Sequence, residues 1–243
     1  MTDRVDLTVV IPAYNEAGRL GPSLAKAVEY LARRGGSWEL LVVDDGSGDA
    51  TSAVAADFAE QGVVVLRHPV NRGKGAAVRT GLLASRGDRV LLSDADFSTP
   101  VTELEKLEAH LAEAPVVIGS RAAAGADVRR RQPLYRELMG KVFNRIIRLL
   151  GAPGIADTQC GFKLLDGDAA RSLAAELTIE GFAYDVELLW LAQSRGLPIR
   201  EVGVVWINSP ESKVSPLRSS LAMLRDVLRI RRRRHRRHRR HRR

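Results

Sequence analysis

The stretch Leu7-Thr8-Val9-Val10-Ile11-Pro12-Ala13-Tyr14-Asn15-Glu16 decides the fold class, because an apolar, β-branched run passes directly into a polar cluster. A helical pattern follows over residues 21–34. Paired strand and helix patterns recur over 40–43 and 51–60, 63–67 and 75–86, and 89–93 and 101–113, before a strand over 116–118. This alternation predicts an α/β fold with a single, Rossmann-like, mainly parallel sheet flanked by helices.

Polar clusters follow three of these predicted strands at the points where the strands end. They are Pro12 to Glu16, Asp44-Asp45-Gly46-Ser47 and Asp94-Ala95-Asp96. In open parallel sheets, ligands bind beyond the carboxyl ends of the strands. The sequence therefore predicts that the three clusters meet at one rim and form a binding site.

The second half of the chain is less regular than the first. After Arg121, a flexible Ala/Gly stretch and the run Arg129-Arg130-Arg131 precede a helical pattern over 133–150. The remaining patterns indicate a strand near 161–165, helices near 167–176 and 184–195, and a strand over 199–207.

The positive charge of the chain is concentrated at its C-terminal end. The formal net charge is +9, but residues 229–243 hold eleven arginines and no acidic residue, which leaves 27 basic and 29 acidic residues elsewhere. We expect these residues to form a disordered Arg/His-rich tail that attracts anionic lipid headgroups. Nucleic-acid phosphates are the rival partner, but the tail lacks the interleaved aromatic residues that stack on bases, so nucleic acid is not expected.

Cysteine content and hydropathy indicate the compartment. Cys160 is the single cysteine and has no internal disulfide partner, and residues 1–10 lack the pattern of a secretory signal. No apolar run reaches the roughly 18 residues that span a bilayer. We expect a cytoplasmic protein bound peripherally to the inner face of the membrane. Amphipathic patterns over 134–150 and 217–228 fit interfacial helices, although packing of their apolar sides on the domain is the alternative.

The two carboxylates after the strand at 90–93 suggest a cation site. Asp94 and Asp96 are separated by one residue, and hard oxygen ligands favour Mg²⁺ or Mn²⁺. Such a cation neutralises the charge on a departing diphosphate. Asp44 and Asp45 could accept hydrogen bonds from a base or ribose. Each acidic pair also has a simpler interpretation, as the cap of a following helix or as a turn.

The run Asn71-Arg72-Gly73-Lys74-Gly75 places glycines and two cations at a strand-to-helix turn. It is consistent with phosphate binding through helix amides and positive charge, or simply with a loop that starts a helix. The spacing of a Walker A motif is missing, and no Gly-x-Gly-x-x-Gly follows the first strand. These features argue against a P-loop and against a dinucleotide-binding site.

Taken together and in order, the motifs resemble an inverting family 2 glycosyltransferase with a GT-A fold. The motifs are those at 10–16, 43–47, 71–75 and 94–96, with Gly119-Ser120-Arg121. The segments 157–163, 182–189 and 212–214 resemble the dolichyl-phosphate glucosyltransferase branch, which is related to the dolichyl-phosphate mannose synthases. The resemblance covers residues 7 to about 228.

The resemblance implies an activity and a domain organisation. It implies transfer of a hexose from a nucleotide sugar, UDP-glucose in this branch, to a polyprenyl or dolichyl phosphate at the cytoplasmic membrane face. The alternatives are a GDP-mannose donor, a soluble glycan acceptor, or a binding protein whose domain has lost catalysis. The GT-A domain would span 1–228, with a nucleotide-binding half over about 1–121, an acceptor half over about 122–228 that ends in an amphipathic helix, and the basic tail over 229–243.

The resemblance also assigns roles to individual residues. It implies donor binding by Pro12, Ala13, Tyr14, Glu16, Asp44, Asp45, Lys74, Asp94 and Lys213. Asp96 would be the principal metal ligand and Asp94 the second. Arg121 and Arg131 would bind the acceptor phosphate, since guanidinium groups suit phosphate oxygens.

Asp157 is grouped with Asp96 and Arg121 as catalytic and is predicted to be an orienting or metal-proximal carboxylate. A base role is its lesser option, because a lipid phosphate with a second pKa of about 6 is already largely ionised at neutral pH.

Overall fold

The computed structural model describes residues 4–129, 153–207 and 222–233 of the chain. Its centre is a seven-stranded sheet with the strand order β3-β2-β1-β4-β7-β5-β8. The strands are β1 (Val5–Ala13), β2 (Trp38–Asp44), β3 (Val63–Arg67), β4 (Gly87–Leu92), β5 (Val116–Ser120), β7 (Lys163–Asp166) and β8 (Ile199–Gly203). Only β7 is antiparallel to its neighbours in this sheet, so the predicted α/β fold with a mainly parallel sheet is confirmed.

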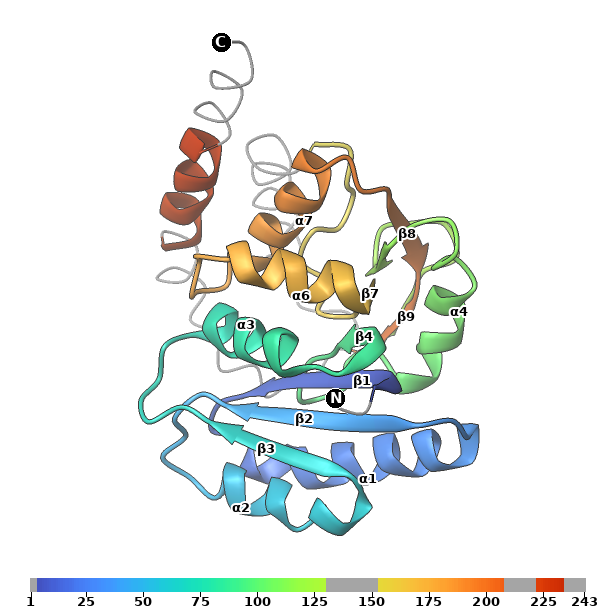
Figure 1. Ribbon diagram of the computed structural model, residues 1–243, viewed down its shortest axis with the longest axis vertical. Coiled ribbons are helices and arrows are strands. Elements are labelled where there is room, and N and C mark those ends of the chain that lie inside the picture. The colour runs from blue at the N-terminus through green and yellow to red at the C-terminus, as the bar shows by residue number, and fades with distance from the viewer. Residues whose placement is uncertain (1–3, 130–152, 208–221, 234–243) are drawn as a thin grey trace.

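Helices cover both faces of the sheet (Figure 1), which explains why the central strands are apolar runs without alternation. Helices α1 (Ala17–Arg34) and α2 (Thr51–Ala56) lie on one face, and α3 (Lys74–Ala84) and α6 (Gly167–Glu176) lie on the other. Successive residues of β1 point to opposite faces, so Val9 belongs to the core under α1 and Val10 to the core under α3.

Some elements differ from their predicted bounds. Helix α1 begins four residues before the predicted start at 21, because the carbonyl of Glu16 accepts the N–H of Leu20 at 2.9 Å. The predicted helices over 51–60 and 101–113 are each divided between a short α-helix and a 3₁₀ turn: α2 with η1 (Ala59–Gln61), and η2 (Val101–Glu103) with α4 (Leu104–Glu108).

The predicted strand over 199–207 is two strands in different sheets. Strand β8 pairs with β5 in the main sheet, whereas β9 (Val205–Ile207) pairs in parallel with β6 (Asp127–Arg129) in a separate sheet. The chain can change sheets here because Gly203 packs so closely that a Cβ would lie 2.3 Å from the carbonyl oxygen of Ala124. Strand β6 was not predicted from the sequence.

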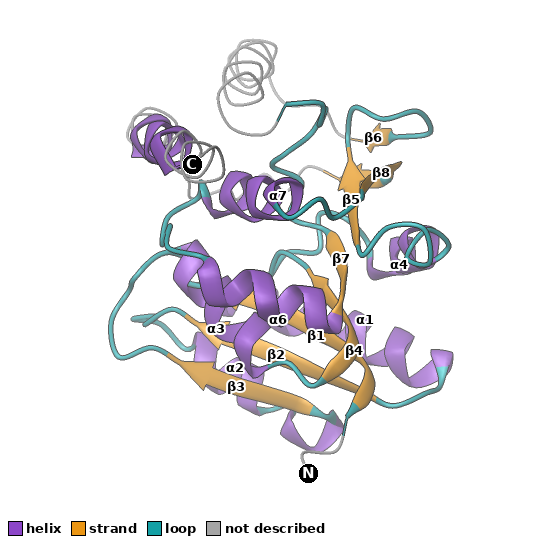
Figure 2. Cartoon of the chain, turned by 45° about the horizontal axis from the view of Figure 1, so that its top comes forward, coloured by secondary structure: helices purple, strands orange, loops and turns teal. Residues whose placement is uncertain are grey.

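Residues 222–233 form a C-terminal helix that lies beside α7 (Tyr184–Ser194), as Figures 1 and 2 both show. The tail predicted from 229 is wrong over residues 229–233, because the helix continues to 233 with Ile230 buried; residues 234–243 lie outside the described residues. Met223, Val227 and Ile230 form its buried side, whereas Leu228 of the predicted apolar stripe is exposed. The helix predicted over 133–150 lies outside the described residues. Within the part of the chain that the structure describes, no helix is long and apolar enough to cross a membrane.

Candidate active site

A cavity of about 480 Å³ opens at the carboxyl ends of β1, β2 and β4. The predicted site residues that line it come from all three polar clusters and from the start of α3: Pro12, Ala13, Tyr14, Glu16, Asp45, Lys74, Asp94 and Asp96. The parallel strands bring these segments together because their carboxyl ends lie on one side of the sheet. The predicted rim is therefore a physical cavity of a size that suits a small-molecule ligand.

Asp94 faces the cavity beside a lysine from α3. Its Oδ1 lies 2.5 Å from Nζ of Lys74, and 38% of its side chain is exposed. Burial raises the pKa of Asp94, but Lys74 and, more weakly, Lys163 and Arg121 outweigh burial and lower it. For Lys74, burial lowers the pKa, but Asp94 and Asp185 raise it overall. Both groups are therefore charged at neutral pH.

Asp96 is held by a different cation, Arg19, from the first turns of α1. Nη1 of Arg19 lies 3.1 Å from Oδ2 of Asp96, and its Nη2 donates to Glu16 at 2.6 Å. The backbone N–H of Ser98 donates to the other oxygen of Asp96 at 3.0 Å. The two candidate metal ligands thus have separate basic partners, both of which line the cavity.

The donor set at this rim fits a magnesium or manganese ion only in part. Among the described residues, no three histidine, cysteine or acidic side chains are grouped closely enough to hold a metal. Mg²⁺, however, is commonly bound by one or two carboxylates, with substrate phosphates and water as the other ligands. Asp94 and Asp96 would supply the two carboxylates, and a diphosphate in the cavity would supply the rest.

Asp44 and Asp45, the predicted nucleoside contacts, have hydrogen-bond partners within the protein. Asp44 is fully buried (0% exposed) and does not line the described cavity. Its Oδ1 accepts the N–H of Ser47 at 2.8 Å, and its Oδ2 accepts the hydroxyl of Ser52. Burial raises the pKa of Asp44, but these hydrogen bonds lower it overall. These local donors agree with the turn interpretation of Asp44, and its nucleoside contact stays a prediction.

Asp45 touches the cavity but mainly supports the loop after β3. Its carboxylate accepts hydrogen bonds from the N–H groups of Arg72 (3.0 Å) and Gly73 (2.6 Å) and from the side chain of Asn71 (2.9 Å). His68 adds a fourth contact at 2.7 Å. The carboxylate therefore holds the glycine-rich loop in place.

The glycines of this loop allow close packing. A Cβ at Gly73 would lie 2.4 Å from the carbonyl oxygen of Glu180, and Gly73 has a φ of 114°. That carbonyl accepts the N–H groups of Gly75 (2.7 Å) and Ala76 (3.2 Å) at the start of α3. The N–H groups of Gly75 and Ala76 therefore already have a partner, and Lys74 is the basic residue that the motif contributes to the cavity lining.

Arg121 and Asp157 form a bidentate ion pair next to the cavity. Nε and Nη2 of Arg121 lie 2.7 and 2.8 Å from the two oxygens of Asp157, and the N–H of Arg121 donates to the same carboxylate at 3.0 Å. Burial raises the pKa of Asp157, but Arg121 outweighs burial and lowers it. Burial alone would lower the pKa of Arg121, whereas the hydrogen bond with Asp157 raises it overall. Asp157 is thus a poor proton acceptor.

The loop that carries Asp157 is fixed from two sides. Glu201 on β8 accepts the N–H groups of Ala156 and Asp157 at 2.6 and 2.9 Å. At the other end of the loop, Gly161 packs against Asp94, since a Cβ there would lie 2.2 Å from its carboxylate. The Arg121–Asp157 pair and the cavity are therefore joined by one short, tightly packed segment.

Comparison with known proteins identifies the family. The model of the family described as "Glycosyl transferase family 2" matches residues 8–173. The chain belongs to this family. The dolichyl-phosphate beta-glucosyltransferase of Mus musculus is 40% identical to this family 2 glycosyltransferase, over 93% of the chain and 75% of the mouse protein.

Solved structures agree with the fold. The mannosyl-3-phosphoglycerate synthase from Rubrobacter xylanophilus is similar with a TM-score of 0.67 and 23% identity, over 96% of this chain and 75% of that one. The Mycobacterium tuberculosis glucosyl-3-phosphoglycerate synthase, in a complex with Mn²⁺, UDP and glucosyl-3-phosphoglycerate, has a TM-score of 0.64 and 22% identity, over 92% and 77%. The predicted family, GT-A fold and glycosyltransferase class are confirmed.

Not every site residue was predicted, and two predicted residues cannot be placed. Arg131 and Lys213 lie outside the described residues. Arg19 and Phe182 line the cavity but were not among the predicted site residues. The sequence offers one indication that Arg19 belongs to the site, since it lies three residues after Glu16 at the start of a helix. Phe182 lies in a loop that reaches the rim only in the folded chain.

Proposed function

We propose that this family 2 enzyme transfers glucose from UDP-glucose to a polyprenyl or dolichyl phosphate, with inversion at the anomeric carbon. The observation that carries the proposal is the cavity in which Asp94, Asp96 and Lys74 converge at the carboxyl ends of the sheet. The choice of sugar and lipid rests on the 40% identity to the mouse protein, which is named a dolichyl-phosphate beta-glucosyltransferase.

The charges and shape of the cavity suit a nucleoside diphosphate sugar. Tyr14 and Phe182 line it with 46% and 40% of their surfaces exposed, and they offer aromatic faces to a base or a sugar. Lys74 and Arg19 lie beside them as the cations for a diphosphate. Both cations are paired with Asp94 and Asp96, so an entering diphosphate and metal would exchange partners with existing ion pairs.

Asp94 and Asp96 would hold a Mg²⁺ or Mn²⁺ ion together with the diphosphate. When bound, the ion acts as a Lewis acid that stabilises the charge of the leaving diphosphate. Lys74, which lines the cavity beside Asp94, would add a positive charge for the diphosphate oxygens. The protein would thus supply one positive charge, that of Lys74, and a binding site for the metal ion.

Arg121 is suited to position the acceptor phosphate. Its side chain is 33% exposed, while Asp157 fixes the plane of its guanidinium group. The acceptor phosphate oxygen attacks the anomeric carbon, and the bond to the diphosphate breaks with its electron pair leaving on UDP. Because the phosphate is already largely ionised, no base is required, and Asp157 acts as the brace of Arg121.

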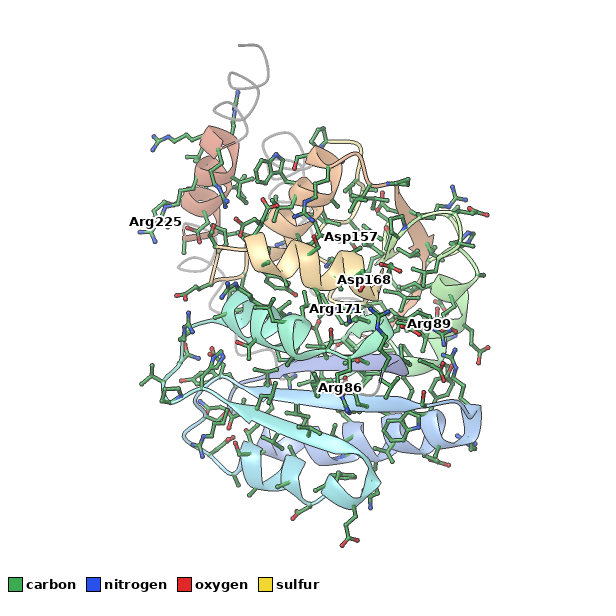
Figure 3. The ribbon with its side chains drawn as sticks, viewed as in Figure 1. Arg86, Arg89, Asp157, Asp168, Arg171 and Arg225 are labelled. Carbon is green, nitrogen blue, oxygen red and sulfur yellow. The ribbon has the colours of Figure 1, made fainter. Side chains whose placement is uncertain are left out.

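The exposed side of the C-terminal helix suits an anionic membrane surface. Leu228 is 42% exposed, and the side chains of Arg225 and Arg229 are 69% and 57% exposed. Figure 3 shows Arg225 extending away from the body of the protein, whereas Asp157 lies inside it. An apolar side chain between arginines is typical of a helix at a lipid interface. We therefore place the enzyme peripherally at the cytoplasmic face.

The test is transfer of labelled sugar to lipid by the purified protein. UDP-glucose and GDP-mannose are supplied separately, with Mg²⁺ or Mn²⁺, polyprenyl phosphate and anionic or neutral vesicles. Asp96→Ala is compared with Asp88→Ala, a carboxylate near the opposite end of β4 that pairs with Arg4 at the surface. We expect metal-dependent labelling from UDP-glucose that Asp96→Ala loses and Asp88→Ala keeps.

Other outcomes separate the alternatives. Labelling from GDP-mannose alone would change the donor, and failure to label lipid despite nucleotide-sugar binding would redirect the search to a soluble acceptor. Equal binding to anionic and neutral vesicles would remove the electrostatic membrane contact from the proposal.

A further inference from the structure

Glu187 is a buried carboxylate that none of the proposed catalytic steps uses. It lies in the first turn of α7 and is 0% exposed. Its oxygens accept the N–H groups of Thr178 and Ile179 at 2.9 and 2.7 Å and the hydroxyl of Thr178 at 2.7 Å. Its ion-pair partner is Arg233, in the last turn of the described C-terminal helix. A fully buried carboxylate requires such compensation.

The segment fixed by Glu187 is a wall of the donor cavity. Directly after Ile179, the carbonyl of Glu180 accepts the first amides of α3, and Gly181 and Phe182 line the cavity. Glu180 also pairs with Arg72 in the loop before α3. The position of Lys74 at the start of α3 therefore depends on the segment that Glu187 holds.

Arg233 attaches the C-terminal helix to this wall. Its Nη1 lies 2.7 Å from the hydroxyl of Thr178, and its guanidinium carbon lies 5.8 Å from the ring centre of Trp190 on α7. The same helix reaches the loop of Asp157, where the side chain of Gln159 donates to the sulfur of Met223 at 3.1 Å. The helix therefore contacts the segments on both sides of the site.

We infer that Glu187 and Arg233 are positioning residues for the donor: docking of the C-terminal helix through this ion pair fixes the wall that carries Phe182 and supports Lys74. This inference rests on the proposed function of the cavity. Without Arg233, Glu187 would remain buried without its cation, and the segment 178–182 would loosen. Donor binding would weaken more than the chemical step, because the segment reaches the donor directly through Phe182, whereas Lys74 is also held by Asp94.

The test compares Arg233→Ala, Arg233→Lys and Glu187→Gln with a matched control, Arg195→Ala. Arg195 follows α7 directly and pairs with Glu176 on α6, so the control also removes one arginine and one ion pair. The dissociation constant for UDP with Mn²⁺ is measured by calorimetry, and KM and kcat are measured for donor turnover. Hydrogen exchange of the peptide covering 178–183 reports on the wall directly.

We expect Arg233→Ala to raise the UDP dissociation constant and the donor KM about tenfold, with kcat changed less than about threefold. Glu187→Gln should weaken UDP binding in the same direction. Arg233→Lys should recover most of the affinity, and Arg195→Ala should bind UDP as the wild type does. Exchange over 178–183 should accelerate in Arg233→Ala and Glu187→Gln but not in Arg195→Ala, in proteins that still melt cooperatively.

Two results would overturn the inference: unchanged UDP affinity and exchange in Arg233→Ala, or equal losses in Arg233→Ala and Arg195→Ala. Failure of the proposed function is distinguishable, because it appears as a lack of lipid labelling by the wild type itself, and in its extreme form as a wild type that does not bind UDP. In that case the exchange of 178–183 alone decides whether Arg233 holds the wall.

Discussion

The carboxylates on the proposed donor side and on the proposed acceptor side of the site are held in opposite ways. On the donor side, the side chains of Asp94 and Asp96 are 38% and 17% exposed, and each forms an ion pair with a lysine or arginine that also lines the cavity. On the acceptor side, Asp157 is 2% exposed, and both of its oxygens are bound by Arg121.

The difference indicates which carboxylates can change partners. A partly exposed carboxylate beside a cavity cation can exchange that cation for a metal at small cost, because water and the entering diphosphate compensate both charges. A buried bidentate pair loses several kcal/mol when it is opened, so it persists through the reaction. The donor side is therefore built for exchange, and the acceptor side is built to keep one geometry.

The largest expected effect is on turnover, through the donor side. Asp96→Ala should reduce kcat/KM about 10³-fold, which corresponds to about 4 kcal/mol of transition-state stabilisation, because it removes a predicted metal ligand. The free energy of unfolding should change by less than about 1 kcal/mol, since Arg19 keeps its contacts with Glu16. Kinetics and urea denaturation check the two parts. A large loss of stability would show that Asp96 is a structural brace like Asp157.

On the proposed acceptor side, we expect a substitution to cost much more stability than Asp96→Ala does. Asp157→Ala should lower the free energy of unfolding by about 3 kcal/mol, because it leaves Arg121 without its partner and removes an acceptor from the loop. Urea denaturation measures the change. The control is Asp168→Ala, in an ion pair at the surface with 73% of the carboxylate side chain exposed, which should cost less than about 1 kcal/mol. Equal costs in the two variants would contradict a fixed acceptor side.

The junction between the two sides can be tested at one glycine. A Cβ at Gly161 would lie 2.2 Å from Oδ2 of Asp94, so Gly161→Ala must displace that carboxylate. Turnover should fall about tenfold or more, since small displacements of a catalytic group are costly. The melting temperature should move little, because a side chain yields rather than the backbone. Gly154→Ala is not a suitable control because its φ is 85°, whereas Gly18→Ala has open space and should be neutral in activity.

The smallest expected effect is a pH dependence of stability. The pKa of Asp157 lies below its ordinary value of 3.8 in the folded protein, so the unfolded chain takes up the proton first as the pH falls. The contribution of the pair is complete above the ordinary pKa and is lost as the pH falls through the folded pKa. The difference in unfolding free energy between wild type and Asp157→Asn should therefore be constant from about pH 7 to 5 and shrink below about pH 4. A difference that changes between pH 7 and 5 would give Asp157 a raised pKa and reopen its role as a base.

Most of the first half of the fold could be predicted from the sequence. Strands β1 to β4 are apolar runs that end in polar or glycine-rich segments, and this local pattern fixes both their type and the side on which they end. The antiparallel insertion of β7 between β4 and β5, and the change of sheet between β8 and β9, could not be predicted. Both depend on long-range pairing, which leaves no signal in the spacing of apolar residues.

The candidate site shows the same division. Asp94 and Asp96 were found because two acids follow a strand, and Arg121 and Asp157 were found through a resemblance of motifs. Their ion pairing, the saturation of Asp44 by Ser47 and Ser52, and the arrival of Phe182 at the rim are properties of the packed chain.

By itself, the sequence determined the α/β class, the family, the rim at which the polar clusters meet and the basic end of the chain. These follow from local patterns, because a side chain's type and its place at the end of a strand are encoded within a few residues. Only the tertiary structure decided which charges neutralise one another: Lys74 with Asp94, Arg19 with Asp96, and Arg233 with Glu187. Ion pairs act over a few ångströms in space and over any separation in the chain, so their partners are known only when the chain is folded.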